Sequence, residues 1–325
     1  MSQGCPTRAS WIASALVAWT KWWLGARPRT LPAAVAPVLV GTAAAVGAGG
    51  AATGLSSVVW WRFGCALAVA LLVQIGTNFA NDYSDGKRGT DDPGARMGPV
   101  RLVGSGLASP RAVKRAAIIC FAATLVAGTP LVLFVDWRLG LVGVAAVAAG
   151  WFYTGGPRPY GYAGLGELFV FVFFGLVATL GSTYVQTESL ADTASPGQLF
   201  PAVSWVAAVA MGCLATALLV INNLRDIPGD TASGKQTLAV RLGAGRTRIL
   251  YTLLIVVPIV CVPLLVLVGA SPVVALALVS VVAARGSVLR VLGGAAGAEL
   301  IAVLGATGMV QLIYGVTVTV GLAVV

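Results

Sequence analysis

The chain has 325 residues, of which 58% are hydrophobic and only 10% are charged. A soluble domain carries about 25% charged residues, so this chain has too few charges to cover a surface that faces water. Lipid must therefore cover most of the molecule, which places the protein in the membrane class. The chain has no histidine, and its five cysteines are scattered without metal-type pairing. Histidine-based nucleophile activation, thiol chemistry and soft-metal sites are thereby excluded.

Nine apolar segments are long enough to cross a bilayer, which takes about 20 helical residues. None alternates apolar and polar residues in the manner of a membrane β-barrel, so the segments are helices. The predicted fold is therefore all-α, a polytopic transmembrane helical bundle of about nine spans. The expected spans cover residues 31–49, 61–80, 112–134, 139–154, 163–184, 198–221, 248–268, 271–291 and 300–323. We expect residues 26–325 to form the transmembrane domain and residues 1–25 to form a cytoplasmic or interfacial segment, because four tryptophans flank Lys21 there.

The basic residues indicate how the bundle is oriented. With nine spans the loops alternate sides, and 19 of the 21 Lys and Arg residues fall on the side of the N-terminus. Only Arg62 and Arg138 fall on the other side. Because Lys and Arg are enriched in cytoplasmic loops, we predict that the N-terminus and the loops at 81–111 and 222–247 are cytoplasmic. A nucleic-acid partner has no support, since the basic residues lie in short loops between spans.

The acidic residues gather in two of these loops. Six of the eight Asp residues follow the second or the sixth span. If each helix continues past the bilayer, the spacings N-x-x-N-D-x-x-D (78–85) and N-N-x-x-D-x-x-x-D (222–230) place the polar side chains on one helix face. Ordinary solvated loop charge is the alternative, but carboxylates that converge from two such faces repel unless a cation lies between them. Oxygen ligands without Cys or His favour Mg²⁺ over zinc or copper.

Basic residues flank both acidic clusters. Lys87 and Arg101 lie near the first cluster, and Lys235 and Arg241 lie near the second. A diphosphate needs a metal to bridge its oxygens and Lys or Arg to offset its remaining charge. The two loops together are therefore suited to bind a diphosphate. The alternative for each basic residue is that it only serves the charge pattern of cytoplasmic loops.

Five segments carry a resemblance to a known family. They are ARPRTLPAAVAPVLVGT (26–42), NFANDYSDGKRGTD (78–91), MGPVRLVGSG (97–106), YTGGPRPYGYAGLGE (153–167) and NNLRDIPGDTASGKQTLAVRLG (222–243). On these segments the chain resembles the UbiA superfamily of intramembrane aromatic prenyltransferases, and within it the branch that prenylates 1,4-dihydroxy-2-naphthoate in menaquinone synthesis. The general family pattern has three residues between the last two aspartates of the first motif, whereas five separate Asp85 from Asp91 here. That spacing is similar to the naphthoate branch, and it leaves the role of Asp91 open.

The resemblance implies a nine-helix bundle around a cavity that opens to lipid, in a bacterial cytoplasmic membrane. It implies Mg²⁺ as cofactor, and polyprenyl diphosphate and 1,4-dihydroxy-2-naphthoate as substrates, with loss of diphosphate and CO₂ to give demethylmenaquinone. The implied metal ligands are Asn78, Asp82, Asp85, Asp91, Asp226 and Asp230. The catalytic candidates are Asp82, Asp85, Asp226 and Asp230. The substrate-binding candidates are Arg27, Asn78, Asn81, Lys87, Arg101, Tyr153, Asn222, Asn223, Lys235 and Arg241.

Two of these candidates have a structural alternative. Arg27 is similar to the first-helix segment of the family, but an arginine at that depth also serves as an interfacial anchor. Tyr153 is expected to line the pocket, where its ring face stabilises allylic positive charge, although aromatic residues also form belts at the membrane interface. The implied chemistry is ionisation of the diphosphate and attack of the aromatic ring on the resulting cation, with water kept away by the apolar bundle. The proton acceptor stays open among Asp, Glu167, Tyr, water and diphosphate.

Three alternatives to this function differ in class or in acceptor. An ion-coupled transporter would carry charges within its spans, and here almost none are found away from the span ends. A phosphatidyl-type transferase keeps its aspartates in one segment, whereas the two clusters here are about 140 residues apart. Other aromatic acceptors, such as 4-hydroxybenzoate, homogentisate or tetrapyrroles, are the nearest competitors, because they change the acceptor pocket rather than the Asp motifs.

Overall fold

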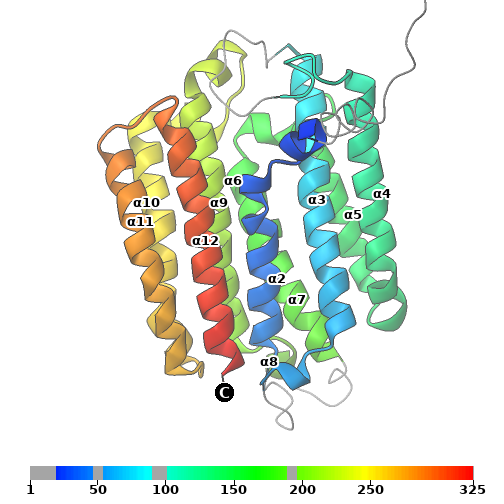
Figure 1. Cartoon of the computed structure of the whole chain (residues 1–325), viewed down its shortest axis with the longest axis vertical. Coiled ribbons are helices and arrows are strands. Elements are labelled where there is room, and N and C mark those ends of the chain that lie inside the picture. Colours follow the sequence, from blue (N-terminus) through cyan, green and yellow to red (C-terminus); the bar gives the residue numbers. More distant parts are fainter. Residues whose placement is uncertain (1–19, 47–53, 90–100, 189–195, 325) are drawn as a thin grey trace, which may run out of the picture.

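The computed structural model describes residues 20–46, 54–89, 101–188 and 196–324. These residues form helices and connecting loops and contain no strand. Figure 1 shows the long helices side by side, with their axes roughly parallel. The prediction of an all-α membrane bundle is confirmed. The segment predicted at 1–25 lies mostly outside the described residues, although residues 20–25 are helical.

The long helices follow one another through the bundle in alternating directions (Figure 1). Up to Thr187 the chain contains α2 (Pro32–Ala44), α3 (Trp60–Lys87), α4 (Pro110–Phe134), α5 (Arg138–Phe152), α6 (Gly166–Val170), the π-helical η4 (Phe171–Val177) and α7 (Ala178–Thr187). From Pro196 onward it contains α8 (Pro196–Leu199), α9 (Ala202–Ala232), α10 (Leu238–Leu267), η6 (Pro272–Leu278), α11 (Val279–Leu292) and α12 (Glu299–Ala323). Short 3₁₀ turns lie at η1 (Pro28–Thr30), η2 (Gly54–Ser57) and η3 (Tyr160–Ala163).

Each of the nine predicted spans corresponds to a helical segment, but two segments are short. Within the described residues, seven helices are long and apolar enough to cross a membrane, whereas α2 and α5 are apolar helices of 13 and 15 residues. The molecule is thus an integral membrane protein, and a count of nine full-length spans is not reached. The helix α2 begins at Pro32, which suits a first helical position because proline has no N–H to leave unpaired there.

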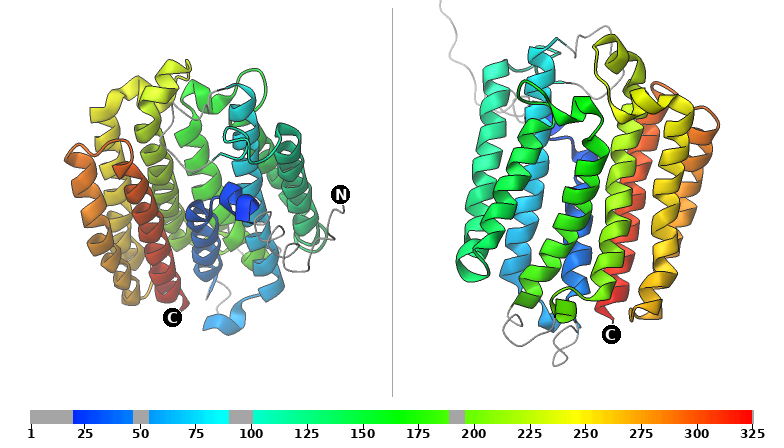
Figure 2. Two further views of the ribbon diagram at one scale, coloured as in Figure 1. Left: turned by 45° about the horizontal axis from the view of Figure 1, so that its top comes forward. Right: turned by 180° about the vertical axis from the view of Figure 1, so that it is seen from behind.

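The bundle is built from two groups of helices that meet at α2 (Figure 2). In one group α3 packs along α4 and α5, and in the other α9 packs along α10 and α12. The helix α2 contacts α3, α7, α9 and α12. The π-helical η4 packs closely on α9, since a Cβ on Gly175 would lie 2.3 Å from the Cα of Gly212. Small residues permit such backbone contact between membrane helices.

Both acidic motifs lie at the same end of the bundle, on helices that extend beyond the predicted spans. The helix α3 continues to Lys87 and α9 continues to Ala232, so each motif occupies the last turns of its helix. Figure 1 shows these two helix ends at the top of the molecule, opposite the C-terminus. At the other end, Arg62 pairs with Glu188 at 3.7 Å. The prediction that the two motifs share one end is confirmed.

Candidate active site

A cavity of about 570 Å³ opens between the two helix groups. Its charged end lies against the last turns of α3 and α9, and its apolar part continues between α2, α3, α4, α5 and the η4–α7 segment. Eleven of the candidate residues line it: Arg27, Asn78, Asn81, Asp85, Arg101, Tyr153, Asn222, Asn223, Asp226, Asp230 and Lys235. The fold thus joins a polar head to an apolar hollow in a single pocket.

Asp85 contacts three polar or charged side chains from other parts of the chain. Its Oδ1 lies 3.3 Å from Lys235 Nζ and also accepts a hydrogen bond from the Tyr162 hydroxyl, while its Oδ2 lies 3.6 Å from an Arg101 guanidinium nitrogen. Burial, and next the Asp85 charge, raise the pKa of Tyr162 above its usual value, so this hydroxyl stays protonated and donates. The sequence predicted Lys235 and Arg101 as substrate-binding residues, and the structure brings both to one carboxylate.

Two asparagines of the same helix have their amide orientation set by neighbours. Asn78 Nδ2 donates to the carbonyl oxygen of Ala26 at 2.9 Å and to Thr30 Oγ1 at 3.2 Å. Asn81 Oδ1 accepts a hydrogen bond of 2.8 Å from the Thr154 hydroxyl. The Asn78 carbonyl oxygen and the Asn81 amide nitrogen are therefore the ends that remain for a ligand.

Asp82 is placed differently from Asp85. It is only 1% exposed, and its two carboxylate oxygens accept hydrogen bonds of 2.8 and 3.0 Å from the backbone N–H groups of Leu102 and Val103. It is absent from the cavity lining. In this structure Asp82 holds the loop that carries Arg101 against the end of α3.

The second motif presents two carboxylates from the end of α9. Asp226 forms a bidentate pair with its neighbour Arg225, at 2.8 Å for both contacts. Asp230 lies 3.8 Å from Lys235. Asn223 Nδ2 donates to the Glu167 carboxylate at 2.8 Å, which fixes the direction of its amide.

Lys235 connects the two motifs. Its Nζ contacts Asp85 and Asp230 and also lies 4.6 Å from the centre of the Tyr162 ring, and the residue is only 5% exposed. Asp85 and Lys235 are 150 positions apart in the chain. A buried ammonium between two carboxylates offsets their repulsion, and this is the place where a cation is needed.

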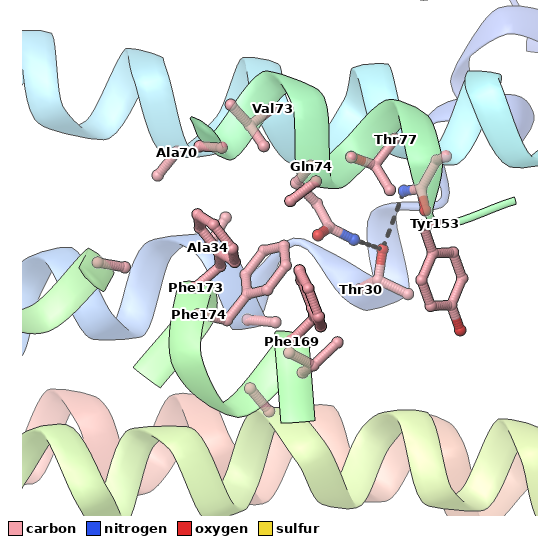
Figure 3. Close-up of a pocket in the computed structure, with 18 of the residues that line it drawn as sticks. Thr30, Ala34, Ala70, Val73, Gln74, Thr77, Tyr153, Phe169, Phe173 and Phe174 are labelled. Carbon is pink, nitrogen blue, oxygen red and sulfur yellow. Dashed lines mark hydrogen bonds between the residues drawn. The ribbon is translucent and has the colours of Figure 1, made fainter. Parts of the chain in front are cut away.

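The apolar part of the cavity has an aromatic wall. The Tyr160 and Phe169 rings stack at 4.0 Å between centroids, and Phe173 stacks on Phe169 at 6.1 Å. Tyr153 packs edge-on against Tyr160 at 5.5 Å. Figure 3 shows Tyr153, Phe169 and Phe173 in the same pocket as the α3 side chains. Ring faces of this kind attract positive charge.

Comparison with known proteins decides the family. Residues 34–294 match the UbiA prenyltransferase family. The chain is 48% identical over 311 residues to the 1,4-dihydroxy-2-naphthoate octaprenyltransferase of Mycobacterium tuberculosis, an alignment that covers 95% of this chain and 98% of that protein. The chain belongs to the UbiA prenyltransferase family.

Solved structures with low sequence identity share the UbiA fold. A UbiA homolog from Aeropyrum pernix matches with a TM-score of 0.66 at 15% identity, covering 90% of this chain and 96% of that one. A UbiA homolog from Archaeoglobus fulgidus, described as bound to DMAPP and Mg²⁺, matches with a TM-score of 0.55 at 14% identity, covering 92% and 99%. The family prediction made from the motifs is confirmed.

Three candidate residues that the structure describes are absent from the cavity lining. Lys87 is exposed at the end of α3, and Arg241 is exposed and donates to the carbonyl oxygen of Gln236. Asp82 lies behind the lining, as described above. Asp91 lies outside the described residues. The UbiA pocket of this chain is therefore built around Asp85, Asp226 and Asp230.

Sequence reasoning missed three polar groups that the fold brings to this pocket. Tyr162 is not among the predicted site residues, yet its hydroxyl donates to Asp85. Gln74 and Thr30 also line the cavity and bond to each other at 2.9 Å. For Gln74 a signal existed, because an uncharged amide one turn before Asn78 in an apolar helix lies on the motif's own face. For Thr30 no sequence signal was visible.

The donor set of the pocket fits a hard divalent ion. Carboxylate and amide oxygens of Asp85, Asp226, Asp230, Asn78 and Asn222 line its charged end, and such oxygens are the ligands that Mg²⁺ takes. Within the described residues no three acidic or soft-ligand side chains are gathered into a complete metal cage.

Proposed function

We propose that this protein transfers a polyprenyl group from polyprenyl diphosphate to 1,4-dihydroxy-2-naphthoate, with release of diphosphate and CO₂, to give demethylmenaquinol, the reduced form of demethylmenaquinone. The observation that carries the proposal is a single cavity whose charged end joins both Asp motifs and whose other end is apolar. A diphosphate suits the first part and a prenyl chain suits the second. The name of the M. tuberculosis relative, which aligns over nearly the whole of both chains, includes this acceptor and supports the choice.

Different residues of the charged end bind the diphosphate oxygens and the metal ion in this proposal. We assign Lys235 and Arg101 to its oxygens, because both already lie at Asp85 in the cavity. Asp85, Asp226 and Asp230, with the Asn78 amide oxygen, would hold Mg²⁺, and the Mg²⁺ of the A. fulgidus homolog supports this cofactor. Bound there, the ion supplies Lewis-acid polarisation of the departing diphosphate. That Asp82 and Asp91 bind metal stays a prediction, and the two hydrogen bonds to Asp82 favour a positioning role for it.

The apolar end serves the allylic cation and the ring that attacks it. The faces of Tyr153 and Phe169 stabilise positive charge at the first prenyl carbon, and the surrounding side chains exclude the water that would trap it. The new C–C bond forms at the ring carbon that bears the carboxylate, and the bond to CO₂ breaks. Its electron pair returns to the ring, so no proton has to leave that carbon and the step needs no base there.

We also infer that the charged end of the cavity faces the cytoplasm in a bacterial cytoplasmic membrane. Of the basic residues, only Arg62 and Arg138 belong to the opposite end, and cytoplasmic loops are enriched in Lys and Arg. Both substrates then reach the site from one side: the diphosphate head and the charged acceptor arrive from water, and the prenyl chain arrives from lipid.

The test is turnover by purified protein in lipid nanodiscs under anaerobic conditions, with Mg²⁺, a polyprenyl diphosphate and 1,4-dihydroxy-2-naphthoate. Mass spectrometry should detect demethylmenaquinol, or demethylmenaquinone after oxidation in air, and Asp226→Asn in parallel should give none. Product formed only with 4-hydroxybenzoate or homogentisate would move the protein to another branch of the family. No prenyl transfer to any aromatic acceptor would refute the proposal.

A further inference from the structure

Gln74 is a polar side chain in the apolar part of the cavity. It is 8% exposed and lines the pocket beside Ala70, Val73 and Ala34. In Figure 3 its amide lies among these side chains, with Phe173 and Phe174 in the same pocket. A buried amide costs free energy unless each of its polar ends has a partner. The question is therefore what pairs with Gln74 when the pocket is loaded.

The direction of the Gln74 amide is set by Thr30. The Thr30 hydroxyl has one hydrogen, which it donates to the carbonyl oxygen of Arg27 at 2.9 Å. It can then only accept from Gln74 and Asn78, whose amide nitrogens lie 2.9 and 3.2 Å away. The nitrogen of the Gln74 amide must therefore face Thr30, and Oε1 must be the other end. The hydrogen-bond network thus decides which end of the Gln74 amide is the nitrogen and which is the oxygen.

Gln74 Oε1 has no donor within the described part of the chain. Among these residues the Gln74 amide makes one hydrogen bond, from Nε2 to Thr30. A prenyl chain carries no donor and cannot satisfy this oxygen. An aromatic ring with a hydroxyl group can, because a hydroxyl donates one hydrogen bond.

The position of Gln74 matches the place where the acceptor ring must lie. It is four residues before Asn78 on α3, which puts it about 6 Å further from the charged end along the helix. The prenyl carbon that reacts is bonded to the diphosphate, so the ring that attacks it lies directly beside the charged end. The aromatic rings of Phe169 and Phe173 line the same part of the cavity and are suited to stack on a naphthalene.

We propose that Gln74 Oε1 accepts a hydrogen bond from a ring hydroxyl of the aromatic acceptor, and that this contact selects hydroxylated rings and sets their register against the first prenyl carbon. The inference rests on the proposed function for the identity of the ring, but not for the hydroxyl contact itself. The competing role is structural: Gln74 would only tie α3 to η1 through Thr30. A site built around a buried polar atom rejects a ligand that leaves this atom unpaired, and a structural tie does not.

The test compares two isomeric inhibitors, each of which keeps a different one of the two hydroxyls of 1,4-dihydroxy-2-naphthoate. The inhibition constants of 1-hydroxy-2-naphthoate and 4-hydroxy-2-naphthoate are measured against 1,4-dihydroxy-2-naphthoate for the wild type, Gln74→Leu and Gln74→Met. In the wild type the analogue that keeps the contacting hydroxyl should bind about tenfold more tightly, equivalent to about 1.4 kcal/mol. In both variants the ratio should fall to within about twofold of one, while the KM for the polyprenyl diphosphate stays unchanged. Each ratio is measured within one preparation, so partial loss of folded protein cancels.

Gln311→Leu is the matched control. Gln311 is 0% exposed on α12, is absent from the cavity lining, and its amide has no partner among the described residues. The same chemical change there should leave the inhibitor ratio at the wild-type value. A ratio that persists in Gln74→Leu, or a wild type that does not distinguish the two analogues, overturns the inference. If the wild type proves to use 4-hydroxybenzoate instead, the same comparison is made with 4-hydroxybenzoate and benzoate. The hydroxyl contact is then tested separately from the naphthoate assignment.

Discussion

Replacing Lys235 by methionine tests whether the two Asp motifs need a cation between them. The change keeps an unbranched side chain that is one atom shorter and removes its charge. At an effective dielectric constant of about 20, the attractions of Lys235 to Asp85 at 3.3 Å and to Asp230 at 3.8 Å are each about 4–5 kcal/mol before desolvation. Removing one partner of a buried ion pair costs about 3–5 kcal/mol, because the remaining charge stays buried and unpaired.

Mg²⁺ should compensate for the lost ammonium if the two motifs hold the ion together. We therefore expect Lys235→Met to lose about 3–5 kcal/mol of stability in EDTA and to regain most of it when Mg²⁺ and a prenyl diphosphate are added. The wild type should gain less from the same addition. The KM for the diphosphate should rise by about 10–100-fold, since a hydrogen bond to a charged group contributes about 1.5–3 kcal/mol.

The assay is reversible unfolding in mixed micelles, with and without Mg²⁺, together with steady-state kinetics in nanodiscs. Lys114→Met is the matched control, because the Lys114 ammonium also lies over a tyrosine ring, 5.7 Å from Tyr83, but is exposed. It should change neither the stability nor the KM for the diphosphate. A Lys235→Met protein as stable as the wild type in EDTA, or one that Mg²⁺ fails to rescue, would refute the shared-cation reasoning.

Three further predictions follow from the site. Asp85→Asn should lower kcat by about 100-fold or more, as expected for loss of a metal ligand worth several kcal/mol, and activity close to that of the wild type would exclude Asp85 from the metal site. Asp82→Ala should cost about 2–4 kcal/mol of stability, because it leaves two buried backbone N–H groups unpaired; unfolding curves equal to those of the wild type would contradict the positioning role. In a background without native cysteines, a membrane-impermeant maleimide should label Ser233→Cys only from the cytoplasmic side and Ser271→Cys only from the other side, and the reverse pattern would invert the topology.

The arrangement of the elements could be predicted from the sequence because hydrophobicity in a membrane is a local property. Each apolar stretch must be helical to satisfy its own backbone, so its approximate limits can be read directly from the residues. Because successive spans alternate in direction, the ends of the second and sixth spans, α3 and α9, must lie on the same side, and the structure agrees. The span predicted at 31–49 is longer than α2, which ends at Ala44, and those predicted at 61–80 and 198–221 are shorter than α3 and α9, since composition does not show where a helix frays or turns.

Neighbouring side chains could be predicted only where they lie on one helix, because their spacing in the sequence then fixes the face that they share. The periodicity of 78–85 and 222–230 predicted faces that carry carboxylates if the helices continue, and α3 and α9 do extend through both motifs. It did not distinguish Asp82 from Asp85. Those residues are three positions apart, and packing alone decides that one meets the backbone of 102–103 while the other meets Lys235.

The sequence by itself therefore determined the class of protein and the shared end of the two motifs, and it predicted the hard-metal, diphosphate chemistry, since these follow from composition, charge and helical spacing. Only the tertiary structure decided that Lys235 joins Asp85 to Asp230 across the bundle and that Thr30 turns the Gln74 amide into the cavity. Such contacts depend on the distance and rotation between helices that are far apart in the chain. Those quantities are set by the packing of many side chains at once, and no local pattern of residues records them.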